Sequence, residues 1–485
     1  MSQTLDAAAR QRAIERCRER QILIPTFAEM RDPSRLSPSL VAGLPDIDMQ
    51  AVHPLNLFRI TWHNDPDTGA FGDVNYLELP RELTGVSARI VGLVGEHFPT
   101  GAHKVGAAFG CLVPRLVSGE FDPTTNRAVW PSTGNYCRGG AFDSALLGCH
   151  AVAILPEEMS RERFEWLESI GAEIIRTPGS ESNVKEIFDA CWELRRSDPD
   201  VVVFNQFDEF GNYLWHYGVT GAAAESVYRT LAGEGDSCAA WVGATGSAGT
   251  LGTGDWLKKR FPGCRITAAE ALQCPTLLMA GFGAHRIEGI GDKHVPWIHN
   301  VRNTDVVTAI DDEATMSLTR LFNEPEGAPV LADYGVSHEV IERLPSLGLS
   351  SICNALAAIK TARYFELGER DILLTSFTDS VDLYRTRLGE MRAERGRYTE
   401  RQAAADLERY LLGATTDHLR ELRYPDRKAI HNLKYFTWVE QQRKTVEELD
   451  ALWAPSFWHD LADQLPEWDA AIQAFNGETG VTYGE

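Results

Sequence analysis

Short apolar runs alternate with amphipathic stretches through the middle of the chain. The apolar runs are typical of strands that are buried on both faces, as in parallel sheets. Strands are predicted within 86–95 and over 128–130, 151–155, 173–177, 201–204, 239–242, 265–270 and 371–376. Helices are predicted over 104–117, 139–147, 160–170, 184–195, 218–231, 253–261 and 350–365. The alternation predicts an α/β protein with two three-layer domains, mostly parallel sheets and a ligand cleft between the domains.

Both ends of the chain depart from this alternation. Residues 2–20 have the periodicity of an amphipathic helix capped by Ser2, and 25–54 have the Pro, Ser, Asp and Gly content of an irregular arm. Charged helical segments and an aromatic tail follow residue 390, and we expect them to pack on the main body rather than to form an interface or an active-site cover. The predicted divisions are 1–84 (N-terminal helix and arm), 85–124 with 216–390 (large α/β domain), 125–215 (smaller mobile α/β domain) and 391–485 (helical C-terminal extension).

Composition and charge narrow the class of partner. The 485 residues are 44% hydrophobic and 24% charged, which is ordinary for a soluble globular protein. A net charge of −22 disfavours nucleic acid and anionic membranes, and no apolar run reaches membrane-spanning length. The nine cysteines are scattered, without a pair at metal-ligand spacing and without a signal peptide. We therefore expect reduced thiols, no metal, no membrane or nucleic-acid partner and a cytoplasmic location.

One lysine has an unusual setting. Lys104 follows the small-residue turn Pro99-Thr-Gly-Ala-His103 and opens the apolar run that begins at Val105. A lysine placed in this way is partly desolvated, so its neutral amine is more accessible and can attack a carbonyl. The carbonyl cofactor that proteins bind through such a lysine is pyridoxal phosphate, held as a Schiff base. A solvated residue at a helix start is the commoner explanation for a single lysine, and two loops decide against it.

The first loop is glycine-rich and joins a predicted strand to a predicted helix. In Gly243-Ala-Thr-Gly-Ser-Ala-Gly-Thr250, small residues allow successive backbone N–H groups to converge on an anion at the helix N-terminus. A dinucleotide site is the alternative, because Gly246, Gly249 and Gly252 are spaced by threes and Glu270 ends the next strand. The spacing is not that of the dinucleotide fingerprint, however, so a phosphate monoester fits this loop better.

The second loop, Ser132-Thr133-Gly134-Asn135, also joins a strand to a helix. Its hydroxyls, N–H groups and amide suit a carboxylate or a phenolic oxygen, although a capping turn would have the same composition. Three further segments carry polar or small residues at places where strands or helices end. They are Asn205-Gln206-Phe207-Asp208, Gly289-Ile290-Gly291 and Ser350-Ser351, the last of which could also be a plain N-cap.

Taken in order, these segments resemble the fold-type II pyridoxal-phosphate enzymes, the family of cysteine synthase, cystathionine β-synthase, the tryptophan synthase β-subunit and serine/threonine dehydratase. Thr100-Gly-Ala-His-Lys104 is similar to the lysine motif of the tryptophan synthase β-subunit. From Asn135 onward, Leu155-Pro-Glu-Glu-Met-Ser160, Ile287-Glu-Gly-Ile-Gly291 and Gly348-Leu-Ser-Ser351 resemble cysteine synthase. The resemblance covers about residues 85–385.

The resemblance implies a role for each of the matching residues. Lys104 would carry the cofactor, Asn135 would contact its phenolic oxygen, and Ser350 would bind the pyridine nitrogen, with Thr378 and Ser380 as stand-ins. A neutral hydroxyl there would favour β-chemistry over transamination. The implied cofactor-binding set is Lys104, His103, Asn135, Gly246, Ser247, Ala248, Gly249, Thr250 and Ser350. The implied substrate-binding set is Ser132, Thr133, Gly134, Gln206 and Gly289.

The implied reaction is β-elimination or β-replacement on a serine- or cysteine-type amino acid through an aminoacrylate, as in cysteine synthase, with a small nucleophile such as a thiol. A deaminating lyase like serine/threonine dehydratase or a desulfhydrase is the alternative, and a non-catalytic regulatory subunit or a nicotinamide enzyme is more remote. A homodimer is expected by analogy. Three departures bear on these roles: Ser132 replaces a glutamate of the tryptophan synthase β-subunit, Val105-Gly106 replaces the Asp-Arg of cysteine synthases, and Ala248 replaces their glycine.

Overall fold

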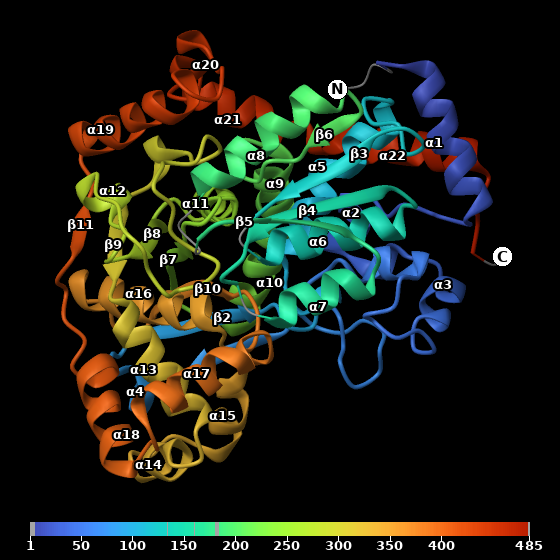
Figure 1. Cartoon of the computed structure of the whole chain (residues 1–485). Coiled ribbons are helices and arrows are strands. Elements are labelled where there is room, and N and C mark those ends of the chain that lie inside the picture. The colour runs from blue at the N-terminus through green and yellow to red at the C-terminus, as the bar shows by residue number, and fades with distance from the viewer. Residues whose placement is uncertain (1–4, 133, 160, 180–183, 484–485) are drawn as a thin grey trace.

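The computed structural model describes residues 5–132, 134–159, 161–179 and 184–483, and every structural statement below concerns these residues. They form two sheets, shown in Figure 1. The larger has seven strands in the order β1 (Tyr76–Leu79), β2 (Arg89–Val94), β10 (Asp371–Phe377), β7 (Ser237–Ala244), β8 (Arg265–Ala271), β9 (Val306–Ile310) and β11 (Leu419–Glu421). The smaller has four, in the order β5 (Glu173–Thr177), β4 (His150–Pro156), β3 (Arg127–Pro131) and β6 (Val201–Val203).

All strand pairs are parallel except those at the two edges of the larger sheet, where β1 and β11 run antiparallel to their neighbours. The predicted α/β class with mostly parallel sheets is confirmed. The strands β1, β9 and β11 were not predicted. β1 and β11 are short edge strands of mixed polarity, and such strands carry little of the apolar signal on which the prediction rests. All four strands of the smaller sheet fall within 125–215.

Helices connect the strands and cover the sheets. Those between β1 and β10 are α4 (Arg81–Thr84), α5 (Lys104–Ser118), α6 (Asn135–Leu146), α7 (Arg161–Ser169), α8 (Val184–Ser197), α9 (Phe210–Trp215), α10 (Gly221–Leu231), α11 (Leu251–Arg260), α12 (Thr276–Met279), α13 (Asp312–Asn323), α14 (Gly327–Asp333), α15 (His338–Arg343) and α16 (Leu349–Tyr364). α5 and α16 are buried on nearly every side, as expected of helices that are apolar all round. α6 begins at Asn135, earlier than predicted. α10 begins at Gly221, and a π-helical turn (His216–Thr220) joins it to α9, which was not predicted.

The N-terminal segment is more regular than predicted. It contains α1 (Ala7–Glu19), α2 (Phe27–Arg31), α3 (Pro38–Gly43) and the 3-10 helix Pro54–Arg59. Asp6 caps α1 by accepting hydrogen bonds from two backbone N–H groups, whereas the predicted cap, Ser2, lies outside the described residues. Thr26 and Ser37 cap α2 and α3. These local hydrogen bonds explain why a segment rich in Ser, Asp and Pro forms short helices rather than an irregular arm.

The C-terminal extension is helical and packs on the main body, as predicted. It contains α17 (Arg385–Arg395), α18 (Glu400–Asp406), α19 (Tyr424–Lys434), α20 (Val446–Ala451), α21 (Pro455–Ala462) and α22 (Leu465–Thr479), with π-helical turns at Leu407–Leu412 and Tyr435–Val439. Lys434 is fully buried and donates to the carbonyl oxygens of Trp297 and His299, 2.8 Å away in each case. Burial lowers the pKa of Lys434 well below its usual range. The extension therefore braces the loop that precedes β9.

Helix α22 lies beside α1, so segments from the two ends of the chain meet (Figure 1). Arg10 forms a bidentate ion pair with Glu478, at 2.8 Å for each hydrogen bond. Asn476 exchanges two hydrogen bonds with the backbone of Ile24, and Asp469 accepts one from the N–H of Phe27. None of the helices in the described part of the chain is both long and apolar enough to cross a membrane.

Candidate active site

A strained turn places Lys104 at the start of α5. Thr100 and Gly101 both have positive φ, 71° and 72°, a conformation that is costly for threonine. Ala102 then pairs with Asp379 beyond the end of β10, and Lys104 follows as the first helical residue. The Nζ atom of Lys104 donates to Ser247 Oγ at 3.2 Å. The turn thus aims the lysine at the glycine-rich loop that follows β7.

The neighbouring His103 points elsewhere. Its ring is fully buried, stacks on Trp62 at 5.5 Å between centroids and meets His216 edge-on at 5.0 Å. Burial, followed by the charge of Lys104, lowers the pKa of His103 to about 3, so the ring is neutral. Successive residues of a helix point about 100° apart, and the lysine takes the direction of the site. The structure therefore places the His103 side chain in the core, away from the position where it was expected to hold a cofactor.

The glycine-rich loop leaves backbone groups open toward an anion. The N–H groups of Gly246, Ser247 and Ala248 donate to no protein acceptor among the described residues. A Cβ on Gly246 would lie 2.8 Å from the carbonyl oxygen of Gly289, so only glycine fits there. Ala248 adopts a φ of 64°, and Thr250 stands at the N-cap position of α11 without a side-chain capping hydrogen bond. Converging N–H groups at the N-terminus of a ten-residue helix form an anion site.

The loop after β3 and the end of β6 face this loop. Ser132 is buried, and its Oγ accepts hydrogen bonds from Gln206 Nε2 at 3.3 Å and from the N–H of Gly134 at 3.1 Å. Asn135 begins α6, and its Nδ2 donates to Asp379 Oδ2 at 2.6 Å. The predicted substrate residue Thr133 lies outside the described residues. Hydroxyl and amide groups from two strand ends thus gather opposite the lysine.

These residues surround one small cavity of about 20 Å³. Of the predicted residues, Lys104, Ser132, Gly134, Asn135, Gln206, Gly246 and Gly289 line it. Tyr136, Phe207, Ile290, Asp292 and Thr378 also line it. A volume of this size holds about one water molecule, so a cofactor or an amino acid can enter only if a wall of the cavity moves.

Two of the lining residues carry chemistry that sequence reasoning missed or ranked low. Asp292 brings a carboxylate into a cavity whose other described polar side chains are hydroxyl, amide and amine groups. It directly follows the Gly289-Ile-Gly291 motif, and that adjacency was the available signal. Thr378, predicted as a stand-in for Ser350, lines the cavity, whereas Ser350 is buried in the first turn of α16 behind Gly289. A Cβ on Gly289 would lie 3.8 Å from Ser350 Oγ.

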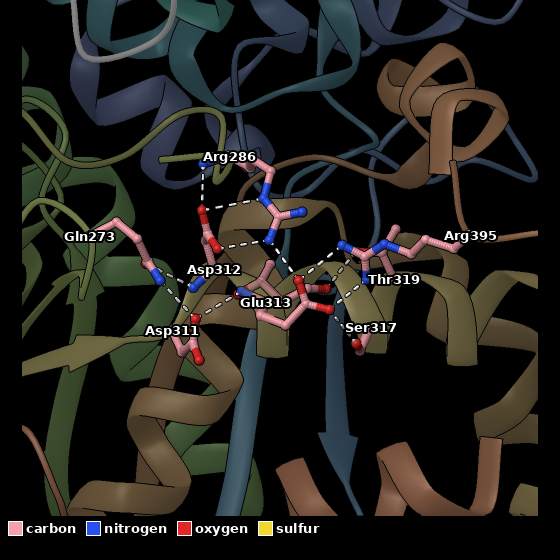
Figure 2. A network of polar contacts seen from close by, with 9 residues as sticks. Gln273, Arg286, Asp311, Asp312, Glu313, Ser317, Thr319 and Arg395 are labelled. Carbon is pink, nitrogen blue, oxygen red and sulfur yellow. Dashed lines mark hydrogen bonds and ion pairs between the residues drawn. The ribbon is translucent and has the colours of Figure 1, made fainter. Parts of the chain in front are cut away.

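The loop that carries Gly289 is irregular, and an ion-pair network anchors it (Figure 2). The backbone N–H of Arg286 donates to Asp312 Oδ2 at 3.0 Å, and its guanidinium donates to Asp312 Oδ1 at 2.9 Å and Glu313 Oε2 at 2.7 Å. Arg395 of α17 binds Glu313 as well. The acidic residues lie in the first turn of α13, where the helix dipole favours negative charge. The network fixes the loop from outside, so its glycines can approach the cavity closely.

The donor set fits pyridoxal phosphate. The open N–H groups of 246–248 match a phosphate monoester, and the lysine amine next to them matches a carbonyl carbon. The Oδ1 atom of Asn135 is buried and has no hydrogen-bond partner among the described residues, so the amide retains unused polar capacity at the cavity. In the described part of the chain, no three His, Cys, Asp or Glu side chains gather as a metal site.

Comparisons with known proteins agree with this geometry. Residues 77–336 match the family model described as pyridoxal-phosphate dependent enzyme. The chain is 30% identical over 319 residues to a probable cysteine synthase of Bacillus subtilis, a match that covers 64% of this chain and 95% of that protein. It is 25% identical to a hydrogen sulfide-producing enzyme from Fusobacterium nucleatum, with a TM-score of 0.54 over 66% of this chain and 88% of that one. An O-acetylserine dependent cystathionine beta-synthase from Helicobacter pylori shares the fold at 23% identity, with a TM-score of 0.55 over 65% of this chain and 95% of that one.

Proposed function

Because the chain belongs to the family of pyridoxal-phosphate dependent enzymes, as its motifs predicted, we propose that it catalyses β-replacement on a small amino acid. The observation that carries the proposal is the position of Lys104, whose Nζ lies 3.2 Å from Ser247 Oγ of the anion-binding loop. When bound, pyridoxal phosphate withdraws electrons from the substrate, so that negative charge at Cα is stabilised. The substrate proposed first is an O-acetylserine-type amino acid, and the second reactant a small thiol.

In this proposal, each group of residues around the cavity binds a different part of the cofactor or the substrate. Lys104 holds the cofactor through Nζ and, once that amine is free, accepts the proton from Cα. The loop 246–250 holds the phosphate through its N–H groups, and Asn135 meets the phenolic oxygen. Ser132 Oγ and Gln206 Nε2 bind the substrate carboxylate together with Thr133. Thr378, which lines the cavity, is our first choice for the ring nitrogen, and Ser350 our second.

Asp292 supports a second candidate, β-elimination, in which the β-substituent leaves and the remaining skeleton takes up water and is released as a keto acid and ammonia. A carboxylate in the cavity can act as a general base toward a water as well as toward a thiol, although the thiol gives up its proton more readily. The similarity to a hydrogen sulfide-producing enzyme favours the same candidate. In either reaction, closure of the four-stranded unit over the cavity would exclude bulk water and decide which nucleophile reacts.

The proposal also covers the oligomeric state and the cellular location of the enzyme. We propose a homodimer by analogy with the family, and a cytoplasmic location. All nine cysteines are free thiols, and burial raises the pKa of Cys17 to about 12, which makes that thiol unreactive. Buried thiols of this kind are typical of proteins kept in reducing compartments.

The test is the visible absorbance of the purified protein with pyridoxal phosphate, before and after O-acetylserine, cysteine, serine or threonine. We expect a cofactor band that shifts with O-acetylserine, and consumption of a thiol such as sulfide with little pyruvate. Stoichiometric pyruvate without a thiol would favour elimination instead. Lys104→Ala should remove the band and at least about a thousandfold of the activity. Lys185→Ala, at an exposed lysine, is the matched control and should change neither. Unchanged activity of Lys104→Ala would overturn the enzymatic proposal and leave the regulatory-subunit alternative.

A further inference from the structure

A chain of buried polar side chains begins at the cavity and crosses the junction between the two sheets. Asn135 Nδ2 donates to Asp379 Oδ2 at 2.6 Å, and the hydroxyl of Tyr384 donates to the same oxygen at 2.6 Å. Asp379 follows β10, and Tyr384 ends the 3-10 helix Val381–Tyr384. Both side chains are fully buried. These hydrogen bonds offset part of the cost of burying the polar groups, although the side-chain oxygen of Asn135 and the second carboxylate oxygen of Asp379 have no hydrogen-bond partner among the described residues.

The chain continues from Tyr384 to the surface. Arg163 of α7 is fully buried, donates to the Tyr384 hydroxyl oxygen at 3.2 Å and lies 3.3 Å from Glu288 Oε2. Arg387 Nε binds Glu288 Oε1 at 2.6 Å, and its second nitrogen donates to the carbonyl oxygen of Glu158 at 2.5 Å. A buried charge without a partner is costly, so the two arginines and Glu288 stabilise one another where they meet.

These residues come from both units. The four-stranded unit provides Asn135, Glu158 and Arg163. The seven-stranded unit provides Glu288, Asp379 and Tyr384, and Arg387 lies on α17, which leads from that unit into the C-terminal extension. Contacts that cross the junction therefore occur at the cavity, in the middle of the chain and at its outer end. Fastening at three successive points resists a hinge motion better than one contact would.

Asp379 is itself fixed to the lysine turn. Its backbone pairs with Ala102, two residues before Lys104, and its carbonyl oxygen accepts from the N–H of Gly348 at 2.8 Å. Burial raises the pKa of Asp379, and the hydrogen bond from Tyr384 and the charge of Arg163 oppose that rise. The Asp379 side chain thus fixes the position of Asn135 relative to the turn that carries Lys104.

We propose that Asp379 is a positioning residue that orients Asn135, and that Asp379, Tyr384, Arg163, Glu288 and Arg387 form a latch that holds the four-stranded unit closed over the cavity. The orienting role rests on the proposed function, since it concerns the cofactor contact assigned to Asn135. A carboxylate only accepts hydrogen bonds, so Asp379 forces the NH₂ group of Asn135 toward itself and leaves the second hydrogen of Nδ2 for the cavity.

The latch also supports the substrate loop. A Cβ at Gly134 would lie 1.2 Å from a guanidinium nitrogen of Arg163, so Arg163 packs directly beneath the Ser132–Asn135 loop. Releasing Arg163 would therefore loosen the residues proposed to bind the substrate carboxylate. Opening the latch and emptying the site are coupled through this one side chain.

The test compares two tyrosines that each donate a short hydrogen bond to an aspartate, one at the junction between the sheets and one away from it. Tyr384→Phe removes the hydroxyl that joins Asp379 to Arg163. Tyr398→Phe removes a similarly short hydrogen bond, from Tyr398 to Asp406 at 2.7 Å, within the C-terminal extension and away from the junction. Hydrogen exchange is measured on the full chain, with and without added pyridoxal phosphate. We expect amides of 135–146 and 161–169 to exchange about tenfold faster in Tyr384→Phe, and at the wild-type rate in Tyr398→Phe.

Asp379→Asn tests the orienting role. We expect a shifted absorbance maximum of the bound cofactor and a kcat/KM lower by about tenfold or more, mainly through kcat, because Asp379 contacts Asn135 and neither Ser132 nor Gln206. Exchange rates in Tyr384→Phe within twofold of the wild type would overturn the latch. An unshifted maximum with kcat/KM within twofold would overturn the orienting role. A chain that takes up no pyridoxal phosphate would contradict the proposed function, yet its exchange rates would still decide the latch.

Discussion

The two walls of the cavity are built differently. The wall on the seven-stranded sheet is made of backbone: the strained turn before Lys104, the open N–H groups of 246–248 and the Gly289 loop that Arg286 anchors. The wall on the four-stranded sheet is made of side chains, Ser132, Asn135 and Gln206, at strand and helix ends. Its strands β5 and β6 are half exposed, whereas the central strands of the larger sheet are buried. Backbone held from several sides cannot adjust, while side chains on a small sheet can move with it.

This difference indicates that the wall on the seven-stranded sheet holds the cofactor and the wall on the four-stranded sheet binds the substrate. A cofactor that stays bound through many turnovers is best held by a rigid frame, and a substrate that enters and leaves needs a wall that opens. The small cavity volume requires such an opening. We therefore expect substitutions in the first wall to affect the cofactor and stability, and substitutions in the second to affect the substrate.

The largest expected effect is that of Gly249→Ala in the rigid wall. A Cβ there would lie 2.1 Å from Asn212 Oδ1, and the Asn212 amide is held by hydrogen bonds to Ser247 Oγ and the carbonyl of Gln206. Overpacking of this kind costs about 3 kcal/mol, so both cofactor affinity and the urea midpoint should fall. The matched control is Gly389→Ala in α17, where nothing lies within 4 Å and stability should stay the same or rise. A normal midpoint in Gly249→Ala would contradict the rigidity of this wall.

A smaller effect, on the substrate alone, is expected from Gln206→Ala. Losing a hydrogen bond to a carboxylate costs about 2 kcal/mol, so KM for the amino acid should rise about 30-fold. The cofactor content and its absorbance should remain those of the wild type. Gln402→Ala, at an exposed position of α18, is the control for the substitution itself. Loss of cofactor from Gln206→Ala would remove the proposed distinction between the walls.

Low pH should destabilise the protein through protonation of His103, which becomes favourable when the chain unfolds. Its folded pKa of about 3 lies below the unfolded value of about 6.5, so the unfolded chain takes up the proton first. The free energy of unfolding should therefore fall between about pH 6.5 and pH 3, by about 1.4 kcal/mol per pH unit from this group. His103→Phe keeps the ring and removes the proton site. Urea unfolding at pH 7.5 and 5.5 should show a shallower loss in the variant, and parallel losses would show that His103 is protonated in the folded state.

The smallest effect should be a gain, from Ala248→Gly. Ala248 has a φ of 64°, and relief of that strain exceeds the extra freedom of glycine in the unfolded chain, so stability should rise by up to about 1 kcal/mol. The same substitution at Ala145, within α6, should instead lower stability by about 1 kcal/mol. Urea unfolding of both variants measures the contrast. A loss at both positions would show that the loop needs the alanine side chain for packing.

Much of the fold and part of the candidate site could be predicted from the sequence. The parallel strands, the lysine turn and the two loops were predictable because each has a local signature: an apolar run, small residues before a lysine, or glycines between a strand and a helix. The class of fold, the family and the cofactor followed from their order. The direction of the His103 ring was not predictable, because it depends on where Trp62 and His216 pack.

Asp292 and Asp379 are two residues near the site that the sequence patterns did not single out. Acidic residues are frequent in this chain, 69 in all; Asp292 has only its place after the Gly289-Ile-Gly291 motif to distinguish it, and Asp379 has no local signal. Asp379 contacts Asn135 across 244 positions of sequence, so its partner is decided only when two sheets come together. Residues whose role depends on a contact of that range are the ones that sequence patterns leave out.

The pairing of α1 with α22 has a consequence for how the protein is made. Arg10 and its partner Glu478 are 468 positions apart, so the first helix leaves the ribosome long before the helix against which it packs. At translation rates of about 5–20 residues per second, the delay is roughly half a minute to a minute and a half. During that time α1 can pack on α5, which is made early, but not yet on α22. The packing of α1 is therefore completed only when translation of the described chain is nearly finished.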